Sequence, residues 1–297
     1  MTATVKFATR PDPLLAGSGL EIGGLLRSEW TKIRSLRSSV TALVLLVVVT
    51  IGFTALFVGL TVGQWDQLDA VQALTYRLDP TRLILGAGFQ LSQLAVCVLG
   101  VLVIANEYSS GTIRASLLAV PHRTPILMAK AAVFAVVVFV VSEVAAFAAF
   151  AVGAPILHSK VPVGISDPGV LRAIIGAGLY GAVLGVFSIS IGAIVRHTAG
   201  GIAGIIAFVL VLAPLTQLIP GSIGAHVHGY LPTSAGQLMI NARQGPDDLL
   251  TPWQGFGVMC LWTAAGLRWI RSAVLRKLRR SAMTTTVRMC RRSIGKC

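Results

Sequence analysis

Residues 131–159 read AAVFAVVVFVVSEVAAFAAFAVGAPILHS, and Glu143 is the only charged residue among them. A helix needs about 20 apolar residues to cross roughly 30 Å of hydrocarbon, so this stretch is long enough to span a membrane. Stretches without Asp, Glu, Lys or Arg recur along the chain at residues 38–65, 83–106, 173–195, 198–225 and 249–267. Their lengths predict an all-α integral membrane protein with six transmembrane helices.

The composition excludes most other protein classes. Hydrophobic residues make up 55% of the 297 residues and charged residues 12%, whereas soluble domains carry about 25% charged residues. Lipid-exposed backbone must satisfy its own hydrogen bonds, which leaves helices or closed barrels. Alternating ten-residue strands are absent from the sequence, and the four cysteines predict no disulfide framework.

The predicted organisation has four parts. A flexible leader covers residues 1–20, an amphipathic helix 21–39, the six-helix transmembrane domain 40–270 and a basic cytoplasmic tail 271–297. The first apolar segment begins near Val40 behind a long polar leader, so we interpret it as a retained helix and not as a signal peptide. The six spans are predicted at residues 40–60, 83–105, 131–153, 173–195, 199–219 and 251–270.

The basic residues set the expected orientation. With both termini in the cytoplasm, 20 of the 25 Lys and Arg residues lie on the cytoplasmic side, as the positive-inside rule requires. We therefore expect a multi-pass protein of the cell membrane. The formal net charge of +14 is then mainly a topology signal, and no nucleic-acid partner is expected.

The segment before the first span has helical periodicity. Its apolar residues recur at spacings of three and four, and its basic residues fall on other faces. Such a helix suits the inner headgroup layer, with membrane lipid as its partner; the alternative is a cytosolic helix packed on the rest of the protein. The apolar residues are Ile22, Leu26, Trp30, Ile33 and Leu36, and the basic residues include Lys32, Arg34 and Arg37.

Catalytic motifs are absent. The sequence contains no P-loop, zinc-protease or Gly-x-Ser-x-Gly motif, so we expect no enzyme activity, cofactor or metal on this chain. His226 and His228 alone are weak evidence for a metal site. Glu143 is the one ionisable residue well inside a predicted span; it is either a functional intramembrane carboxylate or a packing device hydrogen-bonded to a neighbouring helix.

Small residues recur every four positions in the fourth predicted span, at Ala177, Gly181 and Gly185. This spacing allows close approach of two helices. The seam could form within one subunit or between two subunits.

Three segments carry a family resemblance. Residues 26–39 read LRSEWTKIRSLRSS, residues 107–114 read EYSSGTIR and residues 231–237 read LPTSAGQ. In this order they resemble the amphipathic connecting helix, the Glu-x-x-x-Gly-Thr segment and the outer segment before the last span of ABC-2-type ATP-binding-cassette transporter membrane subunits.

The resemblance implies a permease subunit that pairs with a second permease subunit and with separate ATPase subunits, which hold ATP and Mg²⁺. It also implies export, without choosing among drugs, peptides, lipids or glycans. A stand-alone channel or carrier, or a membrane-embedded assembly or immunity factor, is the alternative. In the family the loop between spans two and three docks on the ATPase, so the candidate coupling residues are Glu107, Gly111, Thr112, Arg114, Pro121 and Arg123.

The C-terminal segment departs from the family pattern. From Arg268 onward the sequence holds ten basic residues and no acidic residue. Two interpretations remain open: a basic tail attracted to anionic lipid, or the product of a reading-frame error.

The predicted topology is testable by thiol labelling. Cysteines replacing Ser159 or Asp247 should react with a membrane-impermeant reagent applied to intact cells, because both positions fall in outer loops. A cysteine replacing Ser109, in the predicted inner loop, serves as the protected control. Labelling at Ser109 in intact cells would overturn the orientation.

Overall fold

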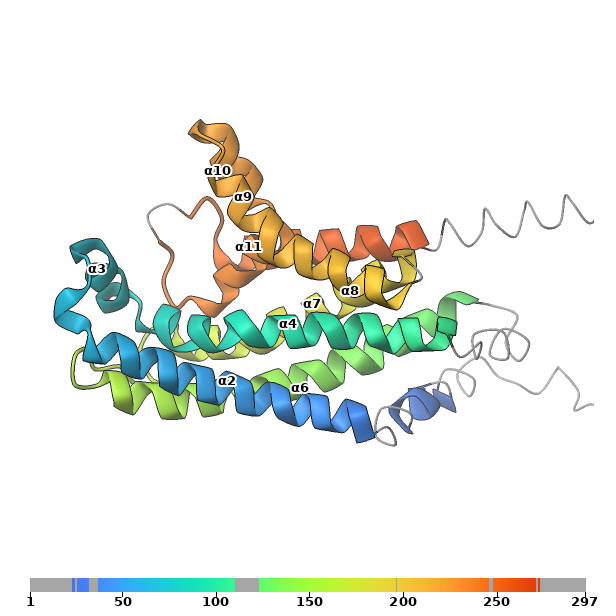
Figure 1. The fold of residues 1–297 in the computed structure, drawn as a ribbon, viewed down its shortest axis with the longest axis horizontal. Coiled ribbons are helices and arrows are strands. Elements are labelled where there is room, and N and C mark those ends of the chain that lie inside the picture. Colours follow the sequence, from blue (N-terminus) through green and yellow to red (C-terminus); the bar gives the residue numbers. More distant parts are fainter. Residues whose placement is uncertain are drawn as a thin grey trace, which may run out of the picture.

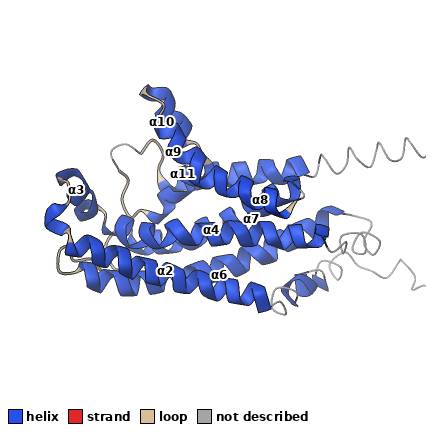
Figure 2. Ribbon diagram, viewed as in Figure 1, coloured by secondary structure: helices blue, strands red, loops and turns tan. Residues whose placement is uncertain are grey.

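The computed structural model describes residues 23–24, 26–31, 37–109, 123–195, 197–245, 248–270 and 272. Within these ranges the regular structure is helical, with no strand (Figure 2). The long helices lie roughly side by side in one elongated bundle (Figure 1). The predicted all-α fold is therefore confirmed for the described part of the chain.

Four long helices form the body of the bundle: α2 (Arg37–Gly63), α4 (Pro80–Ser109), α6 (Arg123–Leu157) and α7 (Val170–Val195). A fifth continuous helical segment consists of α8 (Thr198–Ile206), the π-helical η3 (Ala207–Leu212) and α9 (Ala213–Gln217). Shorter elements are η2 (Trp65–Gln67), α3 (Ala70–Leu78), α10 (Gly221–Gly229), α11 (Pro232–Gln237) and η4 (Leu238–Ile240).

Five helices are long and apolar enough to cross a membrane, and each overlaps one of the predicted spans. They cover Ser39–Gly63, Pro80–Ala105, Met128–Leu157, Val170–Val195 and Thr198–Gln217. Residues 252–270, where the sequence predicts the sixth span, are also helical but are not among these five.

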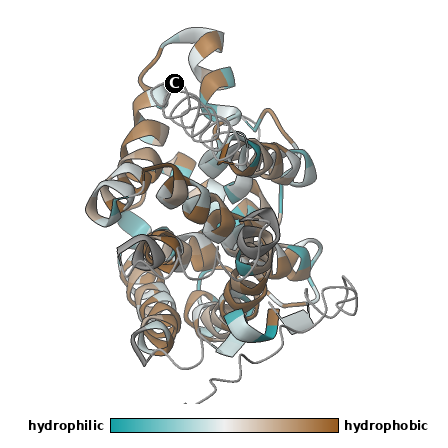
Figure 3. Cartoon of the chain, turned by 90° about the vertical axis from the view of Figure 1, so that its right-hand side faces the viewer, coloured by the Kyte–Doolittle hydropathy of each residue, from teal (hydrophilic) through white to brown (hydrophobic). Residues whose placement is uncertain are grey.

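Apolar side chains cover the outside of the bundle as well as its interior. Val44, Leu45 and Val48 of α2 are each more than half exposed. Figure 3, which looks along the bundle, shows apolar (brown) stretches in helices at its periphery. Exposing such an apolar surface to water costs free energy, whereas contact with lipid hydrocarbon does not. The described bundle therefore suits a lipid environment.

Helix α7 is the central element. In its membrane-spanning window 72% of residues are buried, compared with 22% for α2. The small residues predicted to form a seam face α6: a Cβ at Gly181 would lie 2.6 Å from Ser142 Oγ, and one at Gly185 would lie 2.9 Å from Phe134 Cε1. The seam therefore packs within this chain.

Helices α4 and α7 approach each other closely near Gly100. A Cβ on Gly100 would lie 2.7 Å from both the carbonyl oxygen of Gly185 and Ser188 Cβ. Because one of these atoms belongs to the backbone, a rotamer change cannot relieve the clash. The glycine is therefore needed for the α4–α7 contact.

We predict that Gly100→Ala lowers the free energy of unfolding by about 1–3 kcal/mol, the usual cost of overpacking. Gly59→Ala is the matched control, because nothing lies within 4 Å of a Cβ at that position in α2. The control should leave stability unchanged or raise it, since alanine favours helix. Denaturant titration in detergent measures both; equal stability of the two variants would contradict the close contact.

Candidate functional site

A buried ion pair joins the N-terminal segment to the bundle. Lys130 Nζ of α6 donates a 2.7 Å hydrogen bond to Glu29 Oε2, and each side chain is 5% exposed. Glu29 lies in the helical residues 26–31 and precedes Lys130 by 101 positions. The pair thus fixes this short helix against the base of α6.

The short helix turns its apolar residues away from the described bundle. Trp30 is 51% exposed and Leu26 36% exposed, whereas Glu29 is buried. This arrangement agrees with an apolar face available to lipid, the interfacial position predicted from the sequence. The helical periodicity is visible in the sequence, but the role of Glu29 is not, because a carboxylate within a basic segment gives no sign that it points inward.

The structure describes the predicted coupling segment only in part. Glu107 lies in the last turn of α4, and Arg123 is the first residue of α6. The structure describes the backbone of these two residues but not their side chains. Both helices therefore extend beyond the predicted spans into the predicted inner loop. Other predicted residues lie outside the described ranges: Lys32, Arg34, Gly111, Thr112, Arg114 and Pro121. Arg37 begins α2, and its side chain is also outside the description.

Glu143 lies in α6 against α7. Its carboxylate occupies the space that a side chain at Gly178 would need. Neither carboxylate oxygen is exposed, and neither has a hydrogen-bond partner among the described residues. The described residues therefore do not provide the hydrogen bond on which the packing interpretation depends. An open apolar surface formed by Phe139, Val140 and Phe147 adjoins it.

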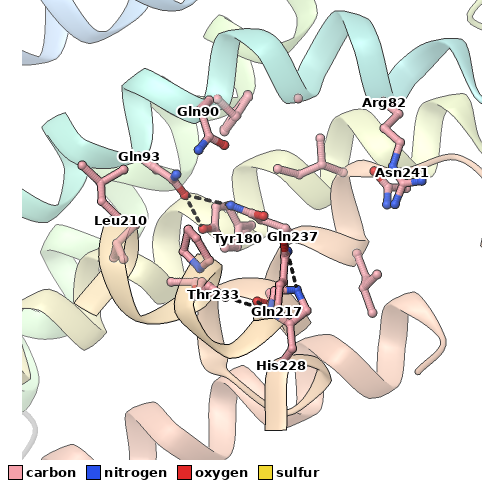
Figure 4. Close-up of a pocket in the computed structure, with 18 of the residues that line it drawn as sticks. Arg82, Gln90, Gln93, Tyr180, Leu210, Gln217, His228, Thr233, Gln237 and Asn241 are labelled. Carbon is pink, nitrogen blue, oxygen red and sulfur yellow. Dashed lines mark hydrogen bonds between the residues drawn. The ribbon is translucent and has the colours of Figure 1, made fainter. Parts of the chain in front are cut away.

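The structure also contains a polar cavity that the sequence analysis did not predict. It has a volume of about 370 Å³ and lies between α4, α7, η3, α9 and α11 (Figure 4). Side chains far apart in the sequence meet in it, among them Gln90, Gln93, Tyr180, Gln217, His228 and Gln237. Glutamines scattered over separate helices carry no local pattern, so only the fold brings them together.

Hydrogen bonds hold one wall of this cavity. Gln93 Oε1 accepts a 2.7 Å bond from Tyr180 Oη and a 3.1 Å bond from Gln237 Nε2. These bonds connect α4, α7 and α11. Because Tyr180 is fully buried, its hydroxyl would otherwise lack a partner, which makes this three-residue cluster structurally important.

A second cluster surrounds His228. Its Nε2 lies 3.2 Å from Gln217 Nε2, and its Nδ1 lies 3.1 Å from Thr216 Oγ1 and from the carbonyl oxygen of Ala213. An Nδ1–H tautomer satisfies this geometry, because Nδ1 then donates and Nε2 accepts from the glutamine. The imidazole therefore connects α10 to α9.

Residues 241–243 lie beside the cavity, which Asn241 lines. Asp79 Oδ2 accepts a 3.1 Å bond from the Arg243 amide, and Thr81 Oγ1 accepts a 2.9 Å bond from the Ala242 amide. Arg172 Nη2 donates to the carbonyl oxygens of Asn241 and Ala242 at 2.6 and 3.0 Å. The segment is thus fixed to the first turns of both α4 and α7.

The weak metal-site hypothesis gains no support. His226 Nδ1 lies 2.7 Å from the carbonyl oxygen of Ser222, while His228 belongs to the cavity wall. No group of three potential metal ligands occurs within the described ranges.

A comparison with protein families matches residues 25–214 to the profile described as ABC-2 family transporter protein. The chain belongs to this family. The match includes two of the three segments that carry the resemblance, and residues 231–237 lie beyond it. A search of curated proteins found no match. ABC-2 membership identifies a transporter membrane protein and suggests that it is a permease subunit.

The ion pair of this ABC-2 protein can be tested by charge exchange. Lys130→Met should destabilise the protein by about 3–5 kcal/mol, because it removes the Lys130 ammonium from the buried Glu29 carboxylate. Combining Glu29→Lys with Lys130→Glu should recover much of that loss. Denaturant titration in detergent measures each variant.

The exposed pair Lys160–Asp66, at 3.5 Å, is the matched control. Lys160→Met should cost at most about 1 kcal/mol. If Lys130→Met costs no more than this control, residues 26–31 are not fixed by the pair.

Proposed function

We propose that this chain is the permease subunit of an ATP-binding-cassette transporter and exports its substrate with energy from ATP hydrolysed by separate ATPase subunits. Membership of the ABC-2 family over residues 25–214 is the observation that carries the proposal. The five spans and the absence of a P-loop from the sequence are consistent with it. ATP and Mg²⁺ would bind the partner ATPases, and a second permease subunit would complete the pathway.

The proposal includes six spans in the cell membrane with both termini in the cytoplasm. The distribution of Lys and Arg supports this orientation. It places residues 26–31, the end of α4 and the start of α6 on the cytoplasmic side. The cavity then lies toward the outer side, near α10 and α11.

Coupling requires a mechanical connection from the ATPase to the spans. The segment between α4 and α6 would dock on the ATPase, with Glu107 and Arg114 among its contacts. Residues 26–31 lie beside the same end of the bundle and are fixed to α6 through the buried Glu29–Lys130 pair. A displacement of α6 would pass directly to α7, because their small residues leave no space between the two helices.

The test is copurification with the ATPase in mild detergent. Glu107→Ala or Arg114→Ala should leave membrane insertion intact and weaken ATPase retention about tenfold, the effect of losing one charge-assisted contact. Asp69→Ala and Arg77→Ala are matched controls at the opposite end of the bundle and should retain the ATPase normally.

Normal ATPase retention and transport by the Glu107→Ala/Arg114→Ala double variant would exclude this loop as the coupling element. Substrate movement by the purified chain alone, without nucleotide, would exclude the ATP-driven permease and favour a channel or carrier.

A further inference from the structure

The polar cavity holds hydrogen-bonding groups that the protein itself does not satisfy. Thr233 lines the cavity and is 2% exposed, and its Oγ1 has no hydrogen-bond partner in the described structure. Gln90, which is exposed and also lines the cavity, makes no side-chain hydrogen bond with another described residue. The buried Thr233 hydroxyl is costly without a partner. A ligand in the cavity could therefore pair with the Thr233 hydroxyl and with the accessible Gln90 carboxamide.

The formal charges at the cavity compensate each other. Arg82 Nη2 lies 3.8 Å from Asp248 Oδ1, and Asp248 Oδ2 also accepts a 2.7 Å bond from the Gly245 amide. Neither an anion nor a cation would find an uncompensated opposite charge among these residues. The site therefore favours an uncharged ligand.

The remaining lining combines donors with acceptors. A carboxamide carries two N–H donors and one carbonyl acceptor; Gln90 keeps all of them, whereas Gln217 and Gln237 each use one donor within the wall. A hydroxyl group both donates and accepts, so several hydroxyls on one ligand can pair with such a lining. Apolar atoms of Phe89 and Val209 complete the wall and can contact the C–H surface of a sugar ring.

The size of the cavity suits a small group. Its volume of about 370 Å³ lies near the lower end of the 300–1,000 Å³ range typical of small-molecule sites.

The wall of the cavity is also preformed, because the Tyr180–Gln93–Gln237 bonds hold α4, α7 and α11 in place without a ligand.

We propose that this cavity binds an uncharged, hydroxyl-rich group of the glycoside class, with Gln90 and Thr233 among its direct hydrogen-bonding contacts. The proposal rests on the proposed function in treating this ligand as cargo; binding itself requires neither ATP nor the ATPase. The same chemistry is present in a free sugar and in the headgroup of a glycolipid.

The experiment uses the purified full chain in phosphatidylcholine nanodiscs. One arm titrates methyl glucoside as the free sugar, and the other incorporates monoglucosyl diacylglycerol as the lipid source. Because a ligand that binds the folded state raises its stability, the thermal unfolding midpoint reports on both arms. Choline and glycerol phosphate are the charged comparison probes.

At least one glucoside source should raise the unfolding midpoint more than either charged probe. Gln90→Leu and Thr233→Val should each weaken that binding about three- to tenfold, the effect of one lost hydrogen bond. Neither substitution breaks a hydrogen bond between described residues, so ligand-free stability should be retained. Gln72→Leu is the matched control, because Gln72 is exposed on α3 and does not line the cavity.

Three results would each overturn the proposal: no stabilisation by either glucoside source, equal or stronger stabilisation by a charged probe, and unchanged glucoside binding by both cavity variants. The result is separate from the ATPase copurification. A chain that retains its ATPase but binds no glucoside would refute the cavity assignment alone, whereas glucoside binding without ATPase retention would refute the permease assignment alone.

Discussion

The fold depends on the close approach of α7 to its neighbours. Glycines at positions 178, 181 and 185 bring α7 against α6, and Gly100 of α4 meets the α7 backbone from another side. Lipid chains are as apolar as the helices they surround, so burial of apolar surface gives little driving force for association inside a membrane. Tight van der Waals packing must supply it, and small residues make that packing possible.

Polar contacts then fix the parts that helix packing alone would leave free. At one end, Asp79, Thr81 and Arg172 hold residues 241–243 across α4 and α7. At the opposite end, Glu29 and Lys130 fix the N-terminal helix to α6. Both sets join segments separated by more than 60 residues, and both hold a non-spanning segment against the bundle. The apolar core determines how the long helices are arranged. The polar contacts determine where residues 26–31 and 241–243 lie against the bundle.

The two kinds of contact differ in how well the sequence predicts them. Gaps between charged residues located the five helices that are long and apolar enough to cross a membrane, because the bilayer imposes a length that a single sequence displays. The four-residue spacing that includes Gly181 and Gly185 likewise predicted a packing face. The Glu29–Lys130 pair and the Gln93–Tyr180–Gln237 cluster could not be predicted this way, since each depends on side chains that only the tertiary fold brings together. The coupling segment followed from family resemblance, and its central residues, including Gly111 and Arg114, lie outside the described structure.

The π-helical segment η3 forms one wall of the cavity. It contributes Val209 and Leu210 to the lining and leads directly into α9, which contributes Gln217. A π-helix holds an extra residue per turn relative to the α-helical hydrogen-bond pattern. Conversion of η3 to α-helix would rotate everything after it by about 100°, the angle of one residue in a helix of 3.6 residues per turn. Gln217 would then leave the cavity without any bending of the helix axis, so a change in hydrogen-bond register within one span could replace a polar wall with an apolar one.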